Sequence, residues 1–95
     1  MIKSFAGKFA EAIWNEKVGK GFPADLVRSA QRKLRMIDAA NVLNDLRAPP
    51  ANRLEALAND RTGQHSIRIN DQWRVCFEWR DRAPGPSNVE IVDYH

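Results

Sequence analysis

The sequence has only one cysteine, Cys76, and two histidines, His65 and His95, among its 95 residues. A single cysteine excludes an intramolecular disulfide and a cysteine-ligated zinc site, and it is typical of a reducing cytoplasm. Two histidines are too few for a metal cluster, so neither a metal nor another cofactor is expected. The chain lacks the run of about 18 apolar residues that a membrane-spanning helix needs. Charged residues interrupt its first segment, where a secretory signal requires an unbroken apolar stretch.

Positively and negatively charged residues are close to balanced in number. The 15 Lys and Arg residues exceed the 12 Asp and Glu residues by three, a mild excess that is compatible with nucleic-acid binding without establishing it. Ten of the fifteen cations are arginines, whose planar guanidinium suits phosphate contacts and stacking on bases. No linker or repeat divides the chain, and its length allows one core. Residues 1–95 are therefore predicted to form a single domain.

The first half of the chain has the periodicity of helices. A first helix is predicted over residues 7–16 and ends before the glycines and Pro23 that follow. A second helix is predicted over residues 24–40. A helix turns by about 100° per residue, which places four apolar residues on one face: Leu26, Ala30, Leu34 and Ile37. Three arginines fall on its opposite side: Arg28, Arg32 and Arg35. They form either a solvated helix face or a basic surface for a nucleic-acid backbone, and the pattern is compatible with both.

The second half has the two-residue period of strands. Strands are predicted over residues 65–70, 73–79 and 88–94, with a hairpin between the first two, a turn over residues 80–87, and a short strand at residues 2–5. The predicted fold class is α+β, with two N-terminal helices packed on a small antiparallel sheet with a mixed edge. The other face of the sheet is expected to display Arg68 and Arg74. Cys76 is predicted to be a small buried residue rather than a nucleophile.

The last predicted strand runs directly into three polar or ionisable residues: Asp93, Tyr94 and His95. Metal-free RNA cleavage needs a base for the 2′-hydroxyl, an acid for the leaving 5′-oxygen and cations around the phosphate. A histidine can be that acid or base near neutral pH, and Arg74 with Arg68 and Arg61 could hold the phosphate. Tyr94 could stack on a base. These residues suffice for RNA cleavage but do not require it, because a solvated tail would look the same.

The chain resembles one protein family over nearly its whole length. The resemblance is carried by four segments: MIKSF, QRKLRMIDAA, RTGQHSIRINDQWRVCFEW and NVEIVDYH. They resemble the HigB toxins of bacterial toxin–antitoxin pairs, within the RelE/ParE superfamily. The resemblance implies a RelE-like fold and a small basic protein that enters the ribosomal A site. There it would cut mRNA without a metal and so inhibit translation.

The resemblance also implies residue roles and partners. Arg74 matches the family's phosphate-contacting arginine, and Asp93, Tyr94 and His95 match its terminal Asp-Tyr-His, with His95 as the acid–base group. Arg61 falls at a further basic position of the family. From the helix and strand patterns, four more arginines are expected to contact RNA or the ribosome with it: Arg28, Arg32, Arg35 and Arg68. A HigA-like helix-turn-helix antitoxin is the implied protein partner. It would neutralise the toxin in a hetero-oligomer that binds operator DNA.

One departure from the family concerns catalysis. Some ribosome-dependent members carry a His and a Lys where this chain has Glu55 and Ala58. Loss of one well-placed electrostatic contact costs about 10²–10³ in rate, so a nuclease of modest activity is expected. Two alternatives stay open because one scaffold can serve several functions. One is a ParE-like, non-catalytic inhibitor of DNA gyrase, and the other is a weakly active member that serves mainly as an antitoxin partner.

Overall fold

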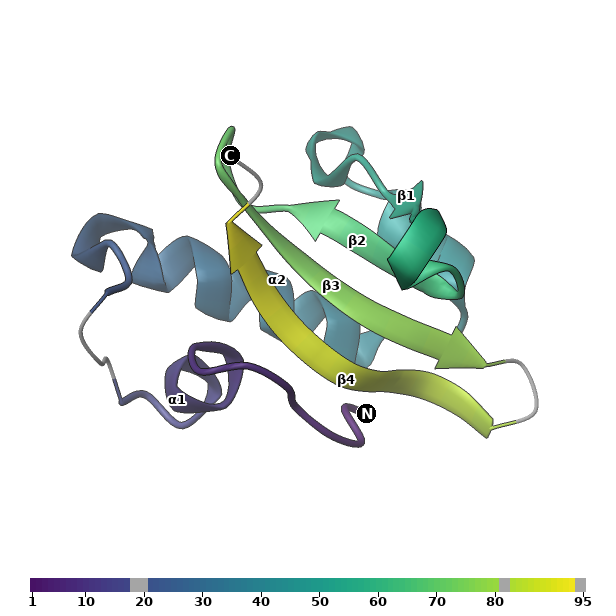
Figure 1. Ribbon diagram of the computed structural model, residues 1–95, viewed down its shortest axis with the longest axis horizontal. Helices are drawn as coiled ribbons and strands as arrows, with labels where there is room; N and C mark the ends of the chain where they lie inside the picture. The colour runs from purple at the N-terminus through teal and green to yellow at the C-terminus, as the bar shows by residue number, and fades with distance from the viewer. Residues whose placement is uncertain (18–20, 81–82, 94–95) are drawn as a thin grey trace.

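A four-stranded antiparallel sheet forms the centre of the protein (Figure 1). The computed structural model describes residues 1–17, 21–80 and 83–93. The strands follow one another in the order β1 (Glu55–Ala56), β2 (Gln64–Arg68), β3 (Trp73–Arg80) and β4 (Ala83–Asp93). The helices are α1 (Ala10–Trp14) and α2 (Val27–Ala39), and the 3-10 helices are η1 (Ala24–Leu26), η2 (Leu43–Arg47), η3 (Pro50–Asn52) and η4 (Asn59–Arg61). The architecture is the predicted α+β class.

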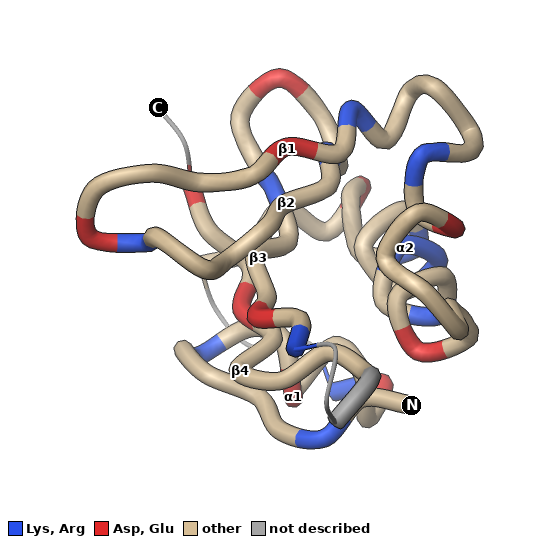
Figure 2. Tube along the Cα trace, turned by 90° about the vertical axis from the view of Figure 1, so that its right-hand side faces the viewer, with Lys and Arg blue, Asp and Glu red and all other residues tan. Residues whose placement is uncertain are grey.

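The core lies between α2 and one face of the sheet. Leu34 and Ile37 of α2 are fully buried, in one cluster with the strand residues Ile67, Val75 and Ile91. These three strand residues lie opposite one another in the register of β2, β3 and β4, so they mark the face that α2 covers. The predicted apolar face of the second helix is confirmed, and its three arginines are exposed: Arg28, Arg32 and Arg35. Figure 2 shows α2 on one side of the sheet.

The first predicted helix is much shorter than expected. Two N-terminal helices were predicted, whereas the described residues contain one long helix, α2, and the five-residue α1. The backbone explains the shortening, because Gly7 and Glu16, on either side of α1, both have positive φ angles (73° and 63°). Such angles are incompatible with a right-handed helix. Gly7 is also needed for space, since a Cβ there would lie 3.0 Å from the Glu90 side chain.

The predicted turn over residues 80–87 was wrong. Strand β4 begins at Ala83 and runs through the Pro84-Gly85-Pro86 sequence; residues 81–82 lie outside the described residues. Proline is tolerated here because β4 is the last strand of the sheet, where a missing backbone N–H disrupts no further ladder. The short strand expected at residues 2–5 is present only as one parallel bridge between Phe5 and Val89, which gives the sheet its mixed edge.

The segment between α2 and β2 has neither the period of a helix nor that of a strand. The structure folds it into η2 and η3, and it adds the two-residue strand β1. Asn52 holds this segment in place: its Nδ2 donates to the Leu46 and Ala48 carbonyl oxygens at 3.2 and 3.3 Å, and its Oδ1 accepts from Lys33 Nζ. Lys33 is buried on α2, and burial, with the nearby charges of Arg32 and Arg68, lowers its pKa. No helix in the described part of the chain is long and apolar enough to cross a membrane.

Candidate functional site

Arg74 is a buried residue near the start of β3, on the sheet face that α2 does not cover. Only 8% of it is exposed, although the sequence predicted that the sheet would display it. Its Nε donates to Ser66 Oγ at 2.8 Å, and its Nη2 donates to the Arg53 carbonyl oxygen at 2.6 Å and to the Ser66 carbonyl oxygen at 3.4 Å. The guanidinium therefore joins β3 to β2 and to the segment that follows η3.

A second arginine is fixed on the same face. Arg61, at the end of η4, donates from Nη1 to Gln64 Oε1 at 3.0 Å and forms an ion pair with Glu90 Oε1 at 3.2 Å. Glu90 lies opposite Cys76 in the β3–β4 register. Cys76 is two residues from Arg74 and thus on the same face. Cys76 is 1% exposed, which confirms the prediction of a small buried residue.

The β2–β3 turn brings further predicted residues to the Arg74 end of the sheet. Arg68 lies opposite Arg74 in the register and pairs with Asp71 in the turn. Asp93, the last residue of β4, lies opposite Trp73 and accepts a 3.0 Å hydrogen bond at its Oδ2 from the turn residue Gln72. Arg68 therefore lies beside Arg74 on the same face, whereas Asp93 shares the face of Trp73 at the same end of the sheet. Tyr94 and His95 lie outside the described residues.

The three exposed arginines of α2 are not part of this group. Arg28, Arg32 and Arg35 belong to the helical layer, which covers the face of the sheet opposite to Arg74. Lys and Arg residues consequently occur on both the sheet and the helical side of the molecule (Figure 2). Any RNA or ribosome contact made by α2 would thus involve a surface separate from the sheet face of Arg74.

His65 lies on the other face of β2 and lines a pocket. Its ring is stacked on Phe77, with the two ring centroids 6.3 Å apart and an interplanar angle of 26°. Its Nδ1 is buried and has no hydrogen-bond partner among the described residues, and burial lowers the His65 pKa below the ordinary value of 6.5. The sequence gives this histidine no predicted role, because the pocket wall at η2 and β1 comes from segments without a periodic signal.

We expect His65 to make the protein less stable in mild acid. The pKa of His65 is lower in the folded than in the unfolded state, so the neutral imidazole favours folding. This contribution to the free energy of unfolding is fully present above the unfolded-state pKa, and it is lost as the pH falls through the folded-state pKa. Urea unfolding at about pH 7 and about pH 5 should show a smaller loss of unfolding free energy in His65→Phe than in the wild type. Equal losses in both proteins would contradict the assigned cause.

Comparison with known proteins identifies the family. A family model described as the RelE-like toxin of the type II toxin–antitoxin system HigB matches residues 3–95. The chain belongs to the HigB-like toxins. It is 38% identical to Toxin HigB-1 of Vibrio cholerae over 82 residues, which cover 85% of this chain and 86% of that protein. It is 33% identical to the Endoribonuclease HigB of Proteus vulgaris over the full length of both chains.

This HigB-like chain has an acidic residue beside the Arg74 face. Glu55 lies opposite Ser66 in the β1–β2 register, so it shares the face of the serine that accepts a hydrogen bond from Arg74. Ala58 is exposed and directly precedes η4. Neither position supplies the positive charge that the resemblance implies for some family members.

Several residues of this HigB-like site were missed by sequence reasoning. Ser66 accepts a hydrogen bond from Arg74, and Gln64 and Glu90 accept hydrogen bonds from Arg61. The two-residue period of the strands could have placed Ser66 on the Arg68 face of β2. The two-residue period does not predict the register between β2 and β3 or the contact between Glu90 and Arg61, because these contacts join segments far apart in the chain.

Proposed function

We propose that this HigB-like toxin is a metal-independent endoribonuclease that cleaves mRNA on the ribosome. The family of toxins and the name of the full-length Proteus vulgaris relative support RNA cleavage. The observation that carries the proposal is the β3–β4 register. Asp93 lies opposite Trp73, the residue before Arg74, so the strand that leads into Tyr94 and His95 ends beside the arginine proposed to hold the phosphate.

In the proposed reaction, a base removes the proton of a ribose 2′-hydroxyl and its oxygen attacks the neighbouring phosphate. The bond to the 5′-oxygen breaks, and an acid returns a proton to that oxygen. His95 is assigned to this proton transfer, and Tyr94 to stacking or hydrogen bonding near the phosphate. Asp93, bonded to Gln72, is assigned to the same catalytic group.

Arg74 is assigned to the charge that develops on the phosphate. Its guanidinium is already anchored by the Ser66 hydroxyl and the Arg53 carbonyl. A cation fixed before the reaction need not reorganise as negative charge builds up, which makes its contribution larger than that of a mobile side chain. Arg68 and Arg61, on the same face, would contact the RNA on either side of the scissile phosphate.

The proposed partners are the ribosome, its mRNA and a cognate HigA-like antitoxin. The exposed arginines of α2, Arg28, Arg32 and Arg35, are assigned to ribosome contacts, because they lie away from the cleavage face. The antitoxin would neutralise the toxin and form the hetero-oligomer that binds operator DNA. All these partners place the proposed activity in the cytoplasm.

The function can be tested in cells by expression with and without the antitoxin. The proposal predicts that expression alone stops amino-acid incorporation and shortens mRNA, while DNA supercoiling is unchanged, and that the antitoxin prevents both effects. Altered supercoiling with intact mRNA would instead identify a gyrase inhibitor. Normal growth and translation would leave the chain as an antitoxin-binding protein alone.

Ala58→Lys is expected to increase the rate of ribosome-dependent cleavage by about tenfold or more, because it adds a cation close to the Arg74 face. The measurement is the initial rate of mRNA cleavage with the ribosome concentration held constant. Ala51→Lys is the matched control, since Ala51 is also exposed but lies in η3. An equal increase in both variants would show that net charge, and not the position of the lysine, raises the rate.

A further inference from the structure

A pocket of about 310 Å³ lies beside the short strand β1. Six residues from η2, β1, β2 and the segment before β1 line it: Leu43, Asn44, Arg47, Leu54, Ala56 and His65. Known ligand pockets begin at about 300 Å³, so this one is suited to a ligand as small as a single nucleotide. His65 directly precedes Ser66 on β2, and neighbouring strand residues point to opposite faces. The pocket is therefore separate from the Arg74 face.

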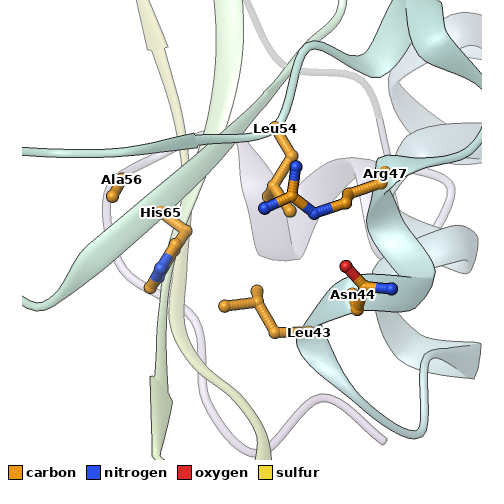
Figure 3. Close-up of a pocket in the computed structure, with 6 residues that line it drawn as sticks. All are labelled: Leu43, Asn44, Arg47, Leu54, Ala56 and His65. Atoms are coloured by element: carbon orange, nitrogen blue, oxygen red, sulfur yellow. The ribbon is translucent and has the colours of Figure 1, made fainter.

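The lining combines apolar side chains with three polar residues: Asn44, Arg47 and His65. Figure 3 shows His65 on the strand side of the pocket, with Arg47 and Asn44 across from it on η2 and with Leu43 and Leu54 between them. Arg47 is exposed and forms no salt bridge within the part of the chain that the structure describes. The ring of His65, which is stacked on Phe77, forms the strand side of the pocket.

We infer that this pocket binds one unpaired nucleotide of the RNA, with the base between the leucines and the phosphate at Arg47. The inference rests on the proposed function and adds a binding site to it. Unstacked RNA bases are recognised by apolar or aromatic contacts together with hydrogen bonds to their edges. The Asn44 amide supplies such a bond, the His65 ring supplies an aromatic contact, and an arginine guanidinium is well matched to a phosphate.

The short strand β1 allows one RNA chain to reach both faces. β1 has two exposed residues and forms one edge of the sheet. Glu55 lies opposite Ser66, on the Arg74 face, whereas Ala56 lies opposite His65 and lines the pocket. An RNA strand that passes over this narrow edge would place a nucleotide in the pocket while a nearby phosphate lies at Arg74. The binding site would thereby fix which nucleotide near the cut is read.

The test is an NMR titration of the isotope-labelled protein with adenosine and uridine 5′-monophosphates and, separately, with inorganic phosphate. Saturable shifts at the six lining residues are expected with at least one nucleotide and not with phosphate alone. Arg47→Gln should weaken nucleotide binding by about tenfold or more, as expected for loss of a charged hydrogen bond. His65→Ala, which removes the ring from the pocket wall, should also weaken it. Arg80→Gln is the matched control, because it removes an exposed arginine at the end of β3.

The outcomes separate this inference from the cleavage proposal, because binding is measured without any reaction. Shifts with phosphate equal to those with nucleotides would overturn base recognition. No shifts in the pocket would overturn the inference even if the protein cleaves mRNA. Nucleotide binding by a protein that cleaves nothing would uphold the pocket and reject the proposed catalysis. Loss of antitoxin affinity in Arg47→Gln, with no nucleotide bound, would overturn the inference and assign the pocket to the protein partner.

Discussion

Arg74→Ala is expected to lower the free energy of unfolding by about 2–4 kcal/mol and the rate of mRNA cleavage by about 10²–10³-fold. The loss of stability follows from the buried position of the guanidinium and from its bonds to the Ser66 hydroxyl and the Arg53 carbonyl. The substitution leaves these acceptors without their donor. Urea unfolding measures the first effect, and single-turnover cleavage, under conditions where the variant is folded, measures the second.

Arg68→Ala is the matched stability control for Arg74. Arg68 lies directly opposite on β2, but its partner Asp71 has a side chain that is 95% exposed. Such surface pairs contribute about 0–1 kcal/mol. Arg74→Lys then tests the chemistry, because lysine keeps the charge and loses the planar fork. If Arg74→Ala unfolds at the same urea concentration as Arg68→Ala, the anchoring of Arg74 to β2 does not stabilise the fold.

His95→Ala is expected to reduce ribosome-dependent cleavage by about 10²–10⁴-fold, the range for loss of a general acid or base. The alanine variant has no group at this position that exchanges a proton near neutral pH. The measurement is the single-turnover cleavage rate of wild type and variant over a range of pH.

Added imidazole distinguishes proton transfer from a structural role of His95. It should restore part of the rate in His95→Ala and leave the wild-type rate unchanged, because the small base can replace the missing side chain. An undiminished rate in His95→Ala would remove His95 from the mechanism. A reduced rate that imidazole does not restore would point to a role in binding rather than in proton transfer.

The elements with a strong hydrophobic period could be predicted from the sequence. The apolar face of α2 and the strands β2 and β3 follow directly from spacings of 3.6 and 2 residues. The two-residue β1 is too short to show any period. The Pro84-Gly85-Pro86 sequence reads as a turn because the local signal does not reveal that β4 is an edge strand, where prolines are tolerated.

The candidate site was predictable only in part, for a related reason. Arg68, Arg74 and Asp93 could be named from composition, chemistry and family resemblance, and the structure brings them to one end of the sheet. The burial of Arg74 depends on the strand register that brings Ser66 to its guanidinium and on the carbonyl of Arg53, which is 21 residues away along the chain. The pocket at His65 depends equally on η2, a segment without a periodic pattern. Long-range contacts of this kind leave no mark in local sequence.

Primer extension on a defined mRNA, with the purified protein added in the presence and absence of ribosomes, decides whether the protein is a ribosome-dependent endoribonuclease. New 5′ ends are expected only when ribosomes translate the mRNA, and they should disappear with His95→Ala. Intact mRNA under both conditions, with folded wild-type protein, would contradict the assignment of this HigB-like chain as a ribosome-dependent endoribonuclease.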